Sequence, residues 1–208
     1  MHSEAFAAPA PPRISLIIPA YNEAAYLPRL LDSVDAARAR FDRGAGAVEV
    51  IVADNASTDA TAKIAAARGC RVARVEKRII GASRNGGARA ARGEVLAFID
   101  ADSRIHPETF NAIDRALAEW RFVAGATGVR MERMSAGIAL TYALLVPWVW
   151  ATGFDTGVVF CRRDDFLAVG GYDEDRLFAE DVFFLVKLWR LGRRRGQRMI
   201  RLVPTCSP

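Results

Sequence analysis

The sequence predicts an α/β fold with a mostly parallel central sheet flanked by helices. The run VLAFI at 95–99 does not alternate with polar residues, which is typical of a parallel strand covered on both faces. In addition, the order of apolar run, loop with carboxylates or amides, and helical pattern occurs three times in the first half of the chain. This alternation favours parallel strands joined by right-handed crossovers.

Length and composition are those of an ordinary globular protein. The 208 residues are 51% hydrophobic and 25% charged, enough to bury a sizeable core, and we expect one domain over residues 13–208. Residues 1–12 carry no basic stretch followed by an apolar core. We therefore expect a disordered lead-in rather than a signal peptide.

The charge of the chain favours anionic ligands. The formal net charge is +5 and the pI is about 9.5. The densest basic run, residues 193–195, is not interleaved with aromatic side chains that could stack on bases, so we expect no nucleic-acid partner. Cys70, Cys161 and Cys206 lie far apart and lack metal-ligand spacing, which favours reduced thiols in a cytoplasmic protein.

The apolar run SAGIALTYALLVPWVWA at 135–151 leaves two interpretations open. It is interrupted by Pro147 and is too short for a membrane-spanning helix, which needs about 20 apolar residues. The favoured interpretation is a buried helix that covers the sheet. The alternative is peripheral contact through Trp148 and Trp150, which would place the protein at the inner face of the cell membrane.

The elements of the first half can be predicted in order. Residues 13–19 are expected to form the first strand, and Pro28 fits only in the first turn of the helix that follows. Residues 48–53 form the second predicted strand, which ends at Asp54, and residues 57–59 are candidate caps for the next helix. The other predicted strands are 70–75, 122–134, 154–163 and 198–203.

The glycine-rich segment GASRNGGARAA at 81–91 enters a further predicted helix. It lacks the G-x-G-x-x-G spacing and no strand directly precedes it, so a dinucleotide site is not predicted. Its backbone could approach a phosphate, with Arg84 nearby, or it could form a flexible turn with surface arginines. Further on, Pro107 is placed for a first helical turn, and His106 is expected at that helix start rather than on a metal.

Asp100 and Asp102 follow the buried run at 95–99 directly. The carboxyl ends of parallel strands form the edge where open α/β sheets bind ligands. Two closely spaced carboxylates at that edge suit a hard divalent cation that also holds phosphates. The alternative is that one aspartate caps the next helix and the other is solvated.

A second acidic cluster lies in the other half of the chain. Gly170 and Gly171 permit a tight turn that returns residues 173–181 toward the strand edge. Glu180 and Asp181 open the next predicted helix, where the helix dipole stabilises a carboxylate whatever its function. Both a site and a simple helix start therefore explain this pair.

Five segments together resemble family 2 glycosyltransferases with the GT-A fold. They are IPAYNE at 18–23, VADNASTDAT at 52–61, ASRNGGARAARGEVLAFIDAD at 82–102, GGYDED at 170–175 and AED at 179–181. The resemblance covers almost the whole chain in the expected order. It implies a Rossmann-like half at 13–103 that binds a nucleotide-sugar, fused to an acceptor-binding and catalytic half at 104–208.

The resemblance also implies roles for single residues. Donor contacts are expected from Pro19, Tyr21 and Glu23 at the base and ribose, Asp54 at the base, Arg84 near the diphosphate and Asp100 at the ribose. Asp102 would hold Mg²⁺ or Mn²⁺. Asp181 would be the catalytic base, ionised with an ordinary pKa of about 3.9, and Glu180, Gly170 and Gly171 would lie at the acceptor.

The implied reaction is an inverting, metal-assisted transfer of a sugar from a nucleoside-diphosphate sugar to an acceptor hydroxyl. The sequence does not identify the acceptor, and a lipid-linked one is among the candidates. Some family members supply a histidine metal ligand late in the chain, but no histidine follows His106 here. Three alternatives therefore stay open: an inactive nucleotide-binding GT-A domain, a nucleotidyltransferase, and a peripheral membrane protein without chemistry.

Overall fold

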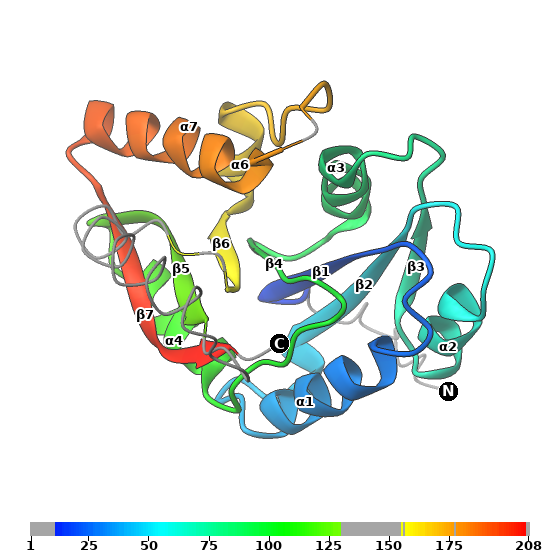
Figure 1. The fold of residues 1–208 in the computed structure, drawn as a ribbon. Helices are drawn as coiled ribbons and strands as arrows, with labels where there is room; N and C mark the ends of the chain where they lie inside the picture. Colours follow the sequence, from blue (N-terminus) through cyan, green and yellow to red (C-terminus); the bar gives the residue numbers. More distant parts are fainter. Residues whose placement is uncertain (1–10, 130–154, 156, 177, 207–208) are drawn as a thin grey trace, which may run out of the picture.

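The computed structural model describes residues 11–129, 155, 157–176 and 178–206, and a seven-stranded sheet runs through it (Figure 1). In chain order the strands are β1 (Ile14–Ala20), β2 (Val48–Asp54), β3 (Arg71–Arg74), β4 (Val95–Phe98), β5 (Phe122–Val129), β6 (Val159–Arg162) and β7 (Arg198–Cys206). Their order across the sheet is β3-β2-β1-β4-β6-β5-β7. Only β6 runs antiparallel to its neighbours among the described strands, so the predicted mostly parallel sheet is confirmed.

Helices cover both faces of this sheet (Figure 1). They are α1 (Leu27–Ala39), η1 (Ala45–Ala47), α2 (Thr61–Ala67), α3 (Ile80–Ala90), α4 (Thr109–Ala118), α6 (Arg163–Ala168) and α7 (Glu180–Arg195). Side chains of α1, α2 and α4 join one core and those of α3, α6 and α7 join another. Because successive strand residues face opposite sides, Leu16 and Ile18 enter the first core and Ile17 enters the second.

Strand β1 lies centrally and aligns the carboxyl ends of its neighbours. Its seven residues are all buried. Parallel pairing sets Ala20 beside Asp54 and Ile17 beside Phe98. Pro19 has no N–H to donate and lies past the end of the β1–β4 ladder, where none is needed. The loops that follow β1, β2 and β4 therefore emerge at one edge.

Glycines let α3 pack close to the sheet. A Cβ on Gly86 would lie 2.4 Å from Val75 Cγ2, and one on Gly87 would lie 2.4 Å from Ile17 Cγ2. Such separations are far below van der Waals contact, so any larger residue would push the helix away. The predicted helix is confirmed, beginning at Ile80, and the alternative of a flexible turn is wrong.

Of the three predicted helix starts, two are confirmed and one is corrected. Pro28 lies in the first turn of α1, as predicted. Pro107 instead lies in the turn before α4. Helix α2 follows Ala60, which makes no side-chain cap, and Asp59 Oδ1 accepts the Thr61 N–H at 2.9 Å from outside the helix. The predicted cap at Asp59 is thus confirmed by its hydrogen bond to the first N–H of α2, whereas Pro107 lies before the helix that it was predicted to begin.

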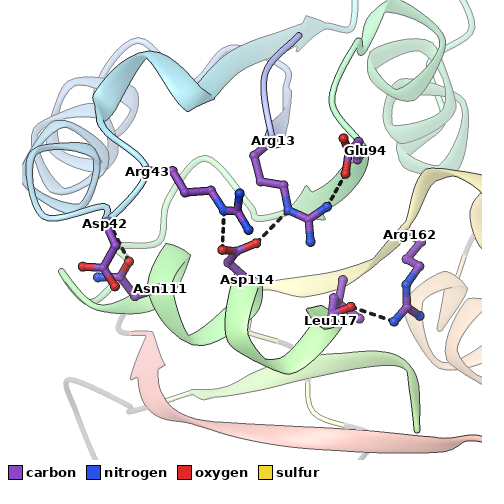
Figure 2. Close-up of polar contacts among 8 residues, drawn as sticks. All are labelled: Arg13, Asp42, Arg43, Glu94, Asn111, Asp114, Leu117 and Arg162. Carbon is purple, nitrogen blue, oxygen red and sulfur yellow. Dashed lines mark hydrogen bonds and ion pairs between the residues drawn. The ribbon is translucent and has the colours of Figure 1, made fainter. Parts of the chain in front are cut away.

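Ion pairs stabilise the end of the sheet where β1 and β4 begin, which is opposite to their carboxyl ends (Figure 2). Arg13, which precedes β1, pairs with Asp114 of α4 at 2.7 Å and also with Glu94, which precedes β4. Arg43 reaches the second oxygen of Asp114 at 2.6 Å. These contacts fix α4 at the amino ends of β1 and β4, so we assign them a structural role.

Some predictions fall outside the described residues. These are residues 1–10 of the lead-in predicted over 1–12, residues 130–134 of the strand predicted over 122–134, and the apolar run at 135–151 with its two tryptophans. Within the part of the chain that is described, no helix is long and apolar enough to cross a membrane. Cys70, Cys161 and Cys206 are free thiols, as predicted.

Candidate functional site

The loop after β1 is fastened to the loop after β2. Asn22, with a left-handed φ of 56°, donates its N–H to Ser57 Oγ at 3.0 Å and accepts the Thr58 N–H on its side-chain oxygen at 2.8 Å. Glu23 donates its N–H to Thr61 Oγ1 at 2.8 Å. The segment YNE therefore projects from the sheet edge in a fixed position.

A cleft of about 250 Å³ opens at this edge. Its lining residues are Pro19, Ala20, Tyr21, Glu23, Asn55, Ile80, Ser83, Asp100, Ala101 and Asp102. The structure thus brings together four of the residues expected at the donor and the expected metal ligand, Asp102. Asp54 lies behind this lining, is 6% exposed, and accepts the Ser57 N–H at 3.3 Å.

The aromatic side chain of Tyr21 is accessible at the cleft. It is 46% exposed, and the Arg78 guanidinium lies 5.3 Å from its ring centroid. An exposed ring beside a cation offers a stacking surface for a planar, anionic ligand. Tyr21 therefore does not pack in the core.

Negative charge accumulates at the mouth of the cleft. Partial burial and the charges of Asp102, Asp100 and Asp59 raise the pKa of Glu23. Asp102 is exposed, and Asp100 has a side chain that is 49% exposed. A bound cation would offset the mutual repulsion of these carboxylates.

The donor set fits a cation shared with a phosphate. The described residues contain no group of three or more histidine, cysteine, aspartate or glutamate side chains that could hold a metal alone. Mg²⁺, however, is commonly held by one or two carboxylates together with substrate phosphates and waters. Asp102 supplies such a carboxylate. His106 is engaged elsewhere, since its Nδ1 accepts the Glu108 N–H at 3.1 Å at the start of α4.

Arg84 lies beside the cleft with its side chain only 3% exposed. Its guanidinium contacts Asp100 at 2.8 Å, Glu180 at 2.7 Å and Asp181 at 3.1 Å. It also lies 5.2 Å from the centroid of the Tyr172 ring. The structure therefore places Arg84 among three carboxylates, where the resemblance had implied a position near a diphosphate.

Glu180 and Asp181 begin helix α7 and face this arginine. Ala179 just before them adopts a left-handed φ of 57°, an uncommon conformation for a residue other than glycine and one often found at functional sites. Burial raises the pKa of Asp181 to about 6, Arg84 opposes the rise, and Asp100 and Glu180 add to it. The expectation of an ordinary pKa is wrong, because the sequence does not reveal that burial.

Asn85 clamps α3 to the segment that leads into α7. Its side-chain oxygen accepts the Tyr172 N–H at 2.9 Å, and its amide donates to Tyr172 O and to Glu174 Oε1, both at 2.9 Å. Gly170 and Gly171 form the predicted turn with φ values of 73° and 63°. A Cβ on Gly171 would lie 2.6 Å from Asn85 Oδ1, so the turn needs glycine there.

Replacing Asn85 with alanine is expected to lower the free energy of unfolding by about 1–3 kcal/mol, because the buried backbone groups of Tyr172 lose their partners. Denaturant unfolding measures the change. The matched control is Arg89→Ala on the same helix, where the side chain is 68% exposed and a change within about 0.5 kcal/mol is expected. A loss at Asn85 no larger than the control would contradict the clamp.

Sequence reasoning did not identify Tyr172, Asn85 or the bridging role of Arg84. Residues 84 and 85 stand beside glycines in a segment whose helical packing is set by the sheet. Tyr172 is buried at 2% exposure within GGYDED. The available signal was the presence of an aromatic residue beside a glycine pair, which does not by itself indicate a site.

A family model and several proteins are similar in sequence to parts of this chain. Residues 15–194 match the family model described as Glycosyl transferase family 2. The validoxylamine A glucosyltransferase of Streptomyces hygroscopicus subsp. jinggangensis is 29% identical, over 79% of this chain and 48% of its own length. The undecaprenyl-phosphate 4-deoxy-4-formamido-L-arabinose transferase of Pseudomonas aeruginosa is 31% identical, over 59% of this chain and 37% of its own. The chain thus spans about half or less of these two relatives.

Solved structures share the fold. The mannosyltransferase PcManGT from Pyrobaculum calidifontis, in complex with GDP-Man and Mn²⁺, matches with a TM-score of 0.75 and 23% identity. The match covers 95% of this chain and 57% of that one. The predicted GT-A fold is therefore confirmed.

Proposed function

Because the chain belongs to glycosyltransferase family 2, we propose that it transfers a sugar from a nucleoside-diphosphate sugar to an acceptor hydroxyl. The observation that carries this proposal is the cleft at the carboxyl edge of the sheet, joined through Arg84 to Asp181, whose side chain is only 18% exposed. A ligand site and a tuned carboxylate side by side are what a group-transfer enzyme requires. The family supplies the class of reaction.

The cleft is proposed to hold the donor. Tyr21 would stack on the base, with Pro19 and Glu23 beside it, and Asp100 would contact the ribose. Asp54 would act on the base only after its loop adjusts, because its side chain is nearly buried. The mannosyltransferase of the same fold, solved in complex with GDP-Man and Mn²⁺, supports a donor of this class.

Asp102 is proposed to hold the metal ion together with the donor phosphates. Its exposed carboxylate at the mouth of the cleft can reach a ligand that Tyr21 and Asp100 also contact. When bound, Mg²⁺ or Mn²⁺ supplies positive charge that neutralises the departing nucleoside diphosphate. The exposed position of Asp102 and the repulsion that raises the pKa of Glu23 support this assignment.

Asp181 is proposed to remove the proton from the attacking acceptor hydroxyl, while Glu180 and the Gly170–Gly171 turn lie on the acceptor side. A single displacement of this kind inverts the configuration at the anomeric carbon. The raised pKa of Asp181, about 6, makes it a stronger base than a solvated aspartate and still leaves it mostly ionised at neutral pH. This combination supports its role as the general base.

The acceptor is proposed to be a hydroxyl compound, with a lipid-linked one as a candidate. The relative named as an undecaprenyl-phosphate transferase supports that candidate. Peripheral membrane contact through residues 135–151 belongs to the same proposal, and those residues lie outside the described part of the chain.

An inactive nucleotide-binding domain is the second candidate function. It is kept open because the lining of the cleft does not include Asp181, so a nucleotide could bind there without any transfer. A nucleotidyltransferase gains no support from membership in a glycosyltransferase family.

A thermal-shift screen tests donor binding in either case. Uridine, guanosine and thymidine diphosphates are each added with Mn²⁺, and a ligand that binds the native state raises the midpoint of unfolding. We expect one of them to raise it clearly more than the others, and only with the cation present. Absence of any shift with all of them would contradict donor binding, and binding without turnover would favour the inactive domain.

The rate of transfer is expected to rise with pH through about 6, because the base must be ionised. At about pH 5 the rate should be roughly tenfold below its plateau. The effect on stability has the opposite sign: a raised pKa stabilises the fold below about pH 4, and that contribution is lost as the pH rises through 6. A pH–rate profile at saturating donor measures the first effect, and a flat profile from pH 5 to 8 would contradict it.

A further inference from the structure

Arg84 connects three parts of the molecule that are distant in sequence. It comes from the middle of α3, Asp100 follows β4, and Glu180 and Asp181 begin α7. With contacts of 2.7 to 3.1 Å to all three carboxylates, the guanidinium forms the bridge between the donor cleft and the proposed base. Charge-assisted contacts of an arginine in a buried place are strong and directional.

The two oxygens of Asp181 differ in their surroundings. Oδ2 contacts Arg84 Nη2 at 3.1 Å. Oδ1 is buried, and the buried hydroxyl of Tyr172 faces the Asp181 carboxylate. The exposed 18% of the Asp181 side chain therefore excludes Oδ1, which leaves Oδ2 as the oxygen that an acceptor hydroxyl can reach.

We propose that Arg84 is a positioning residue: it holds Asp181 Oδ2 at a fixed place relative to Asp100 and the donor cleft, and it does not bind the donor diphosphate itself. The inference rests on the proposed function and deepens it. With its side chain 3% exposed and its Nη atoms already on carboxylates, Arg84 has little surface to offer a phosphate. Its effect on transfer is exerted through Asp181.

The charges around Asp181 make this role measurable. The groups that face it are Arg84 from α3, Asp100 after β4, its neighbour Glu180, and Tyr172 from the preceding turn. Of these groups only Arg84 is cationic. Burial, and after it the charge of Asp181, raises the pKa of Tyr172, so the phenol is neutral and adds no charge. Removing the cation leaves Asp181 with two acidic neighbours. An opposite charge at this range lowers an aspartate pKa by about 1–3 units, so its loss should raise the Asp181 pKa by a similar amount.

The test compares Arg84→Gln and Arg84→Lys with the wild type, and Arg89→Gln on the same helix is the matched control. For Arg84→Gln we expect kcat to fall by about a hundredfold at neutral pH, with the ascending limb of the pH profile moved upward. Calorimetric affinity for the nucleoside diphosphate should change by less than about threefold. Arg84→Lys keeps the charge and should recover part of the rate, and Arg89→Gln should match the wild type.

A second measurement needs no turnover. The ¹³C resonance of the Asp181 carboxyl, assigned with Asp181→Asn, is followed against pH in the wild type and in Arg84→Lys and Arg84→Gln. A higher pKa in Arg84→Gln supports the inference even if the wild type transfers no sugar, a result that would overturn only the proposed function. An unchanged Asp181 pKa in Arg84→Gln would overturn the positioning role. Should that variant not fold, an unchanged kcat in Arg84→Lys would overturn it, because a lysine ammonium cannot make the three carboxylate contacts of the guanidinium. So would a loss of diphosphate affinity in proportion to rate, with nucleoside affinity unchanged.

Discussion

Replacement of Asp181 by asparagine is expected to lower sugar transfer by about two to four orders of magnitude, the usual scale for loss of a general base. Asparagine keeps the size of the side chain and a hydrogen-bond acceptor for Arg84, but it does not take the proton. The affinity for nucleoside diphosphate should stay nearly unchanged, because Asp181 does not line the donor cleft. Steady-state transfer and calorimetry on the same preparation measure the two quantities.

Glu180→Gln is the matched control for this variant. Glu180 also contacts Arg84 and also begins α7, so loss of a negative charge at the helix start is common to both variants. We expect a smaller loss of transfer for Glu180→Gln than for Asp181→Asn. If affinity fell in proportion to rate, Asp181 would be a donor or metal ligand. If transfer were unchanged, it would be a helix-start residue, and the base would have to be sought among Glu180, Asp173 and Asp175.

Replacement of Asp102 by asparagine is expected to weaken nucleoside-diphosphate binding in the presence of Mn²⁺ by at least about tenfold. Loss of a group that only hydrogen-bonds a metal ligand typically lowers metal affinity by about 10–100-fold, so loss of a ligand itself should lower it by no less. The remaining binding should no longer depend on the cation. Calorimetric titrations with Mn²⁺ and with a chelator give both values.

Asp175→Asn serves as the control for Asp102, because it removes a carboxylate that is 96% exposed and lies outside the lining of the cleft. We expect its affinity and its cation dependence to equal those of the wild type. Unchanged metal dependence in Asp102→Asn would move the metal to another residue, with Asp100 and Glu23 the next carboxylates at the mouth of the cleft.

The sequence predicted the sheet and the edge because local patterns determine them. The mostly apolar runs of β1, β2 and β4 are buried as expected apart from Glu49, and their parallel order brings Tyr21, Glu23, Asp100 and Asp102 to one cleft. A carboxylate that directly follows such a strand must lie near that edge, whatever the rest of the chain does.

The partners of Arg84 could not be predicted in the same way. Its contact with Glu180 joins residues that are 96 positions apart, and it forms only because Gly81 lets α3 approach the turn at 172–173, where a Cβ would lie 2.9 Å from Asp173 O. The local sequence pattern does not predict contacts between segments that are so far apart in the chain. The pKa of Asp181 was misjudged for the same reason, since its burial arises from elements that meet only in the folded chain.

The most direct test of the account is to follow the reaction of the wild-type protein by ¹H NMR with diamagnetic Mg²⁺, the nucleotide-sugar whose diphosphate binds best, and water or an added alcohol as the acceptor hydroxyl. The signal of the anomeric proton distinguishes donor, product and free sugar, and it reports the configuration of the first product before any slow exchange. We predict consumption of the donor and a first product with the anomeric configuration opposite to that of the donor, with Asp181→Asn at least about a hundredfold slower. A product that retains the donor configuration, or no consumption of any bound nucleotide-sugar, would contradict the account.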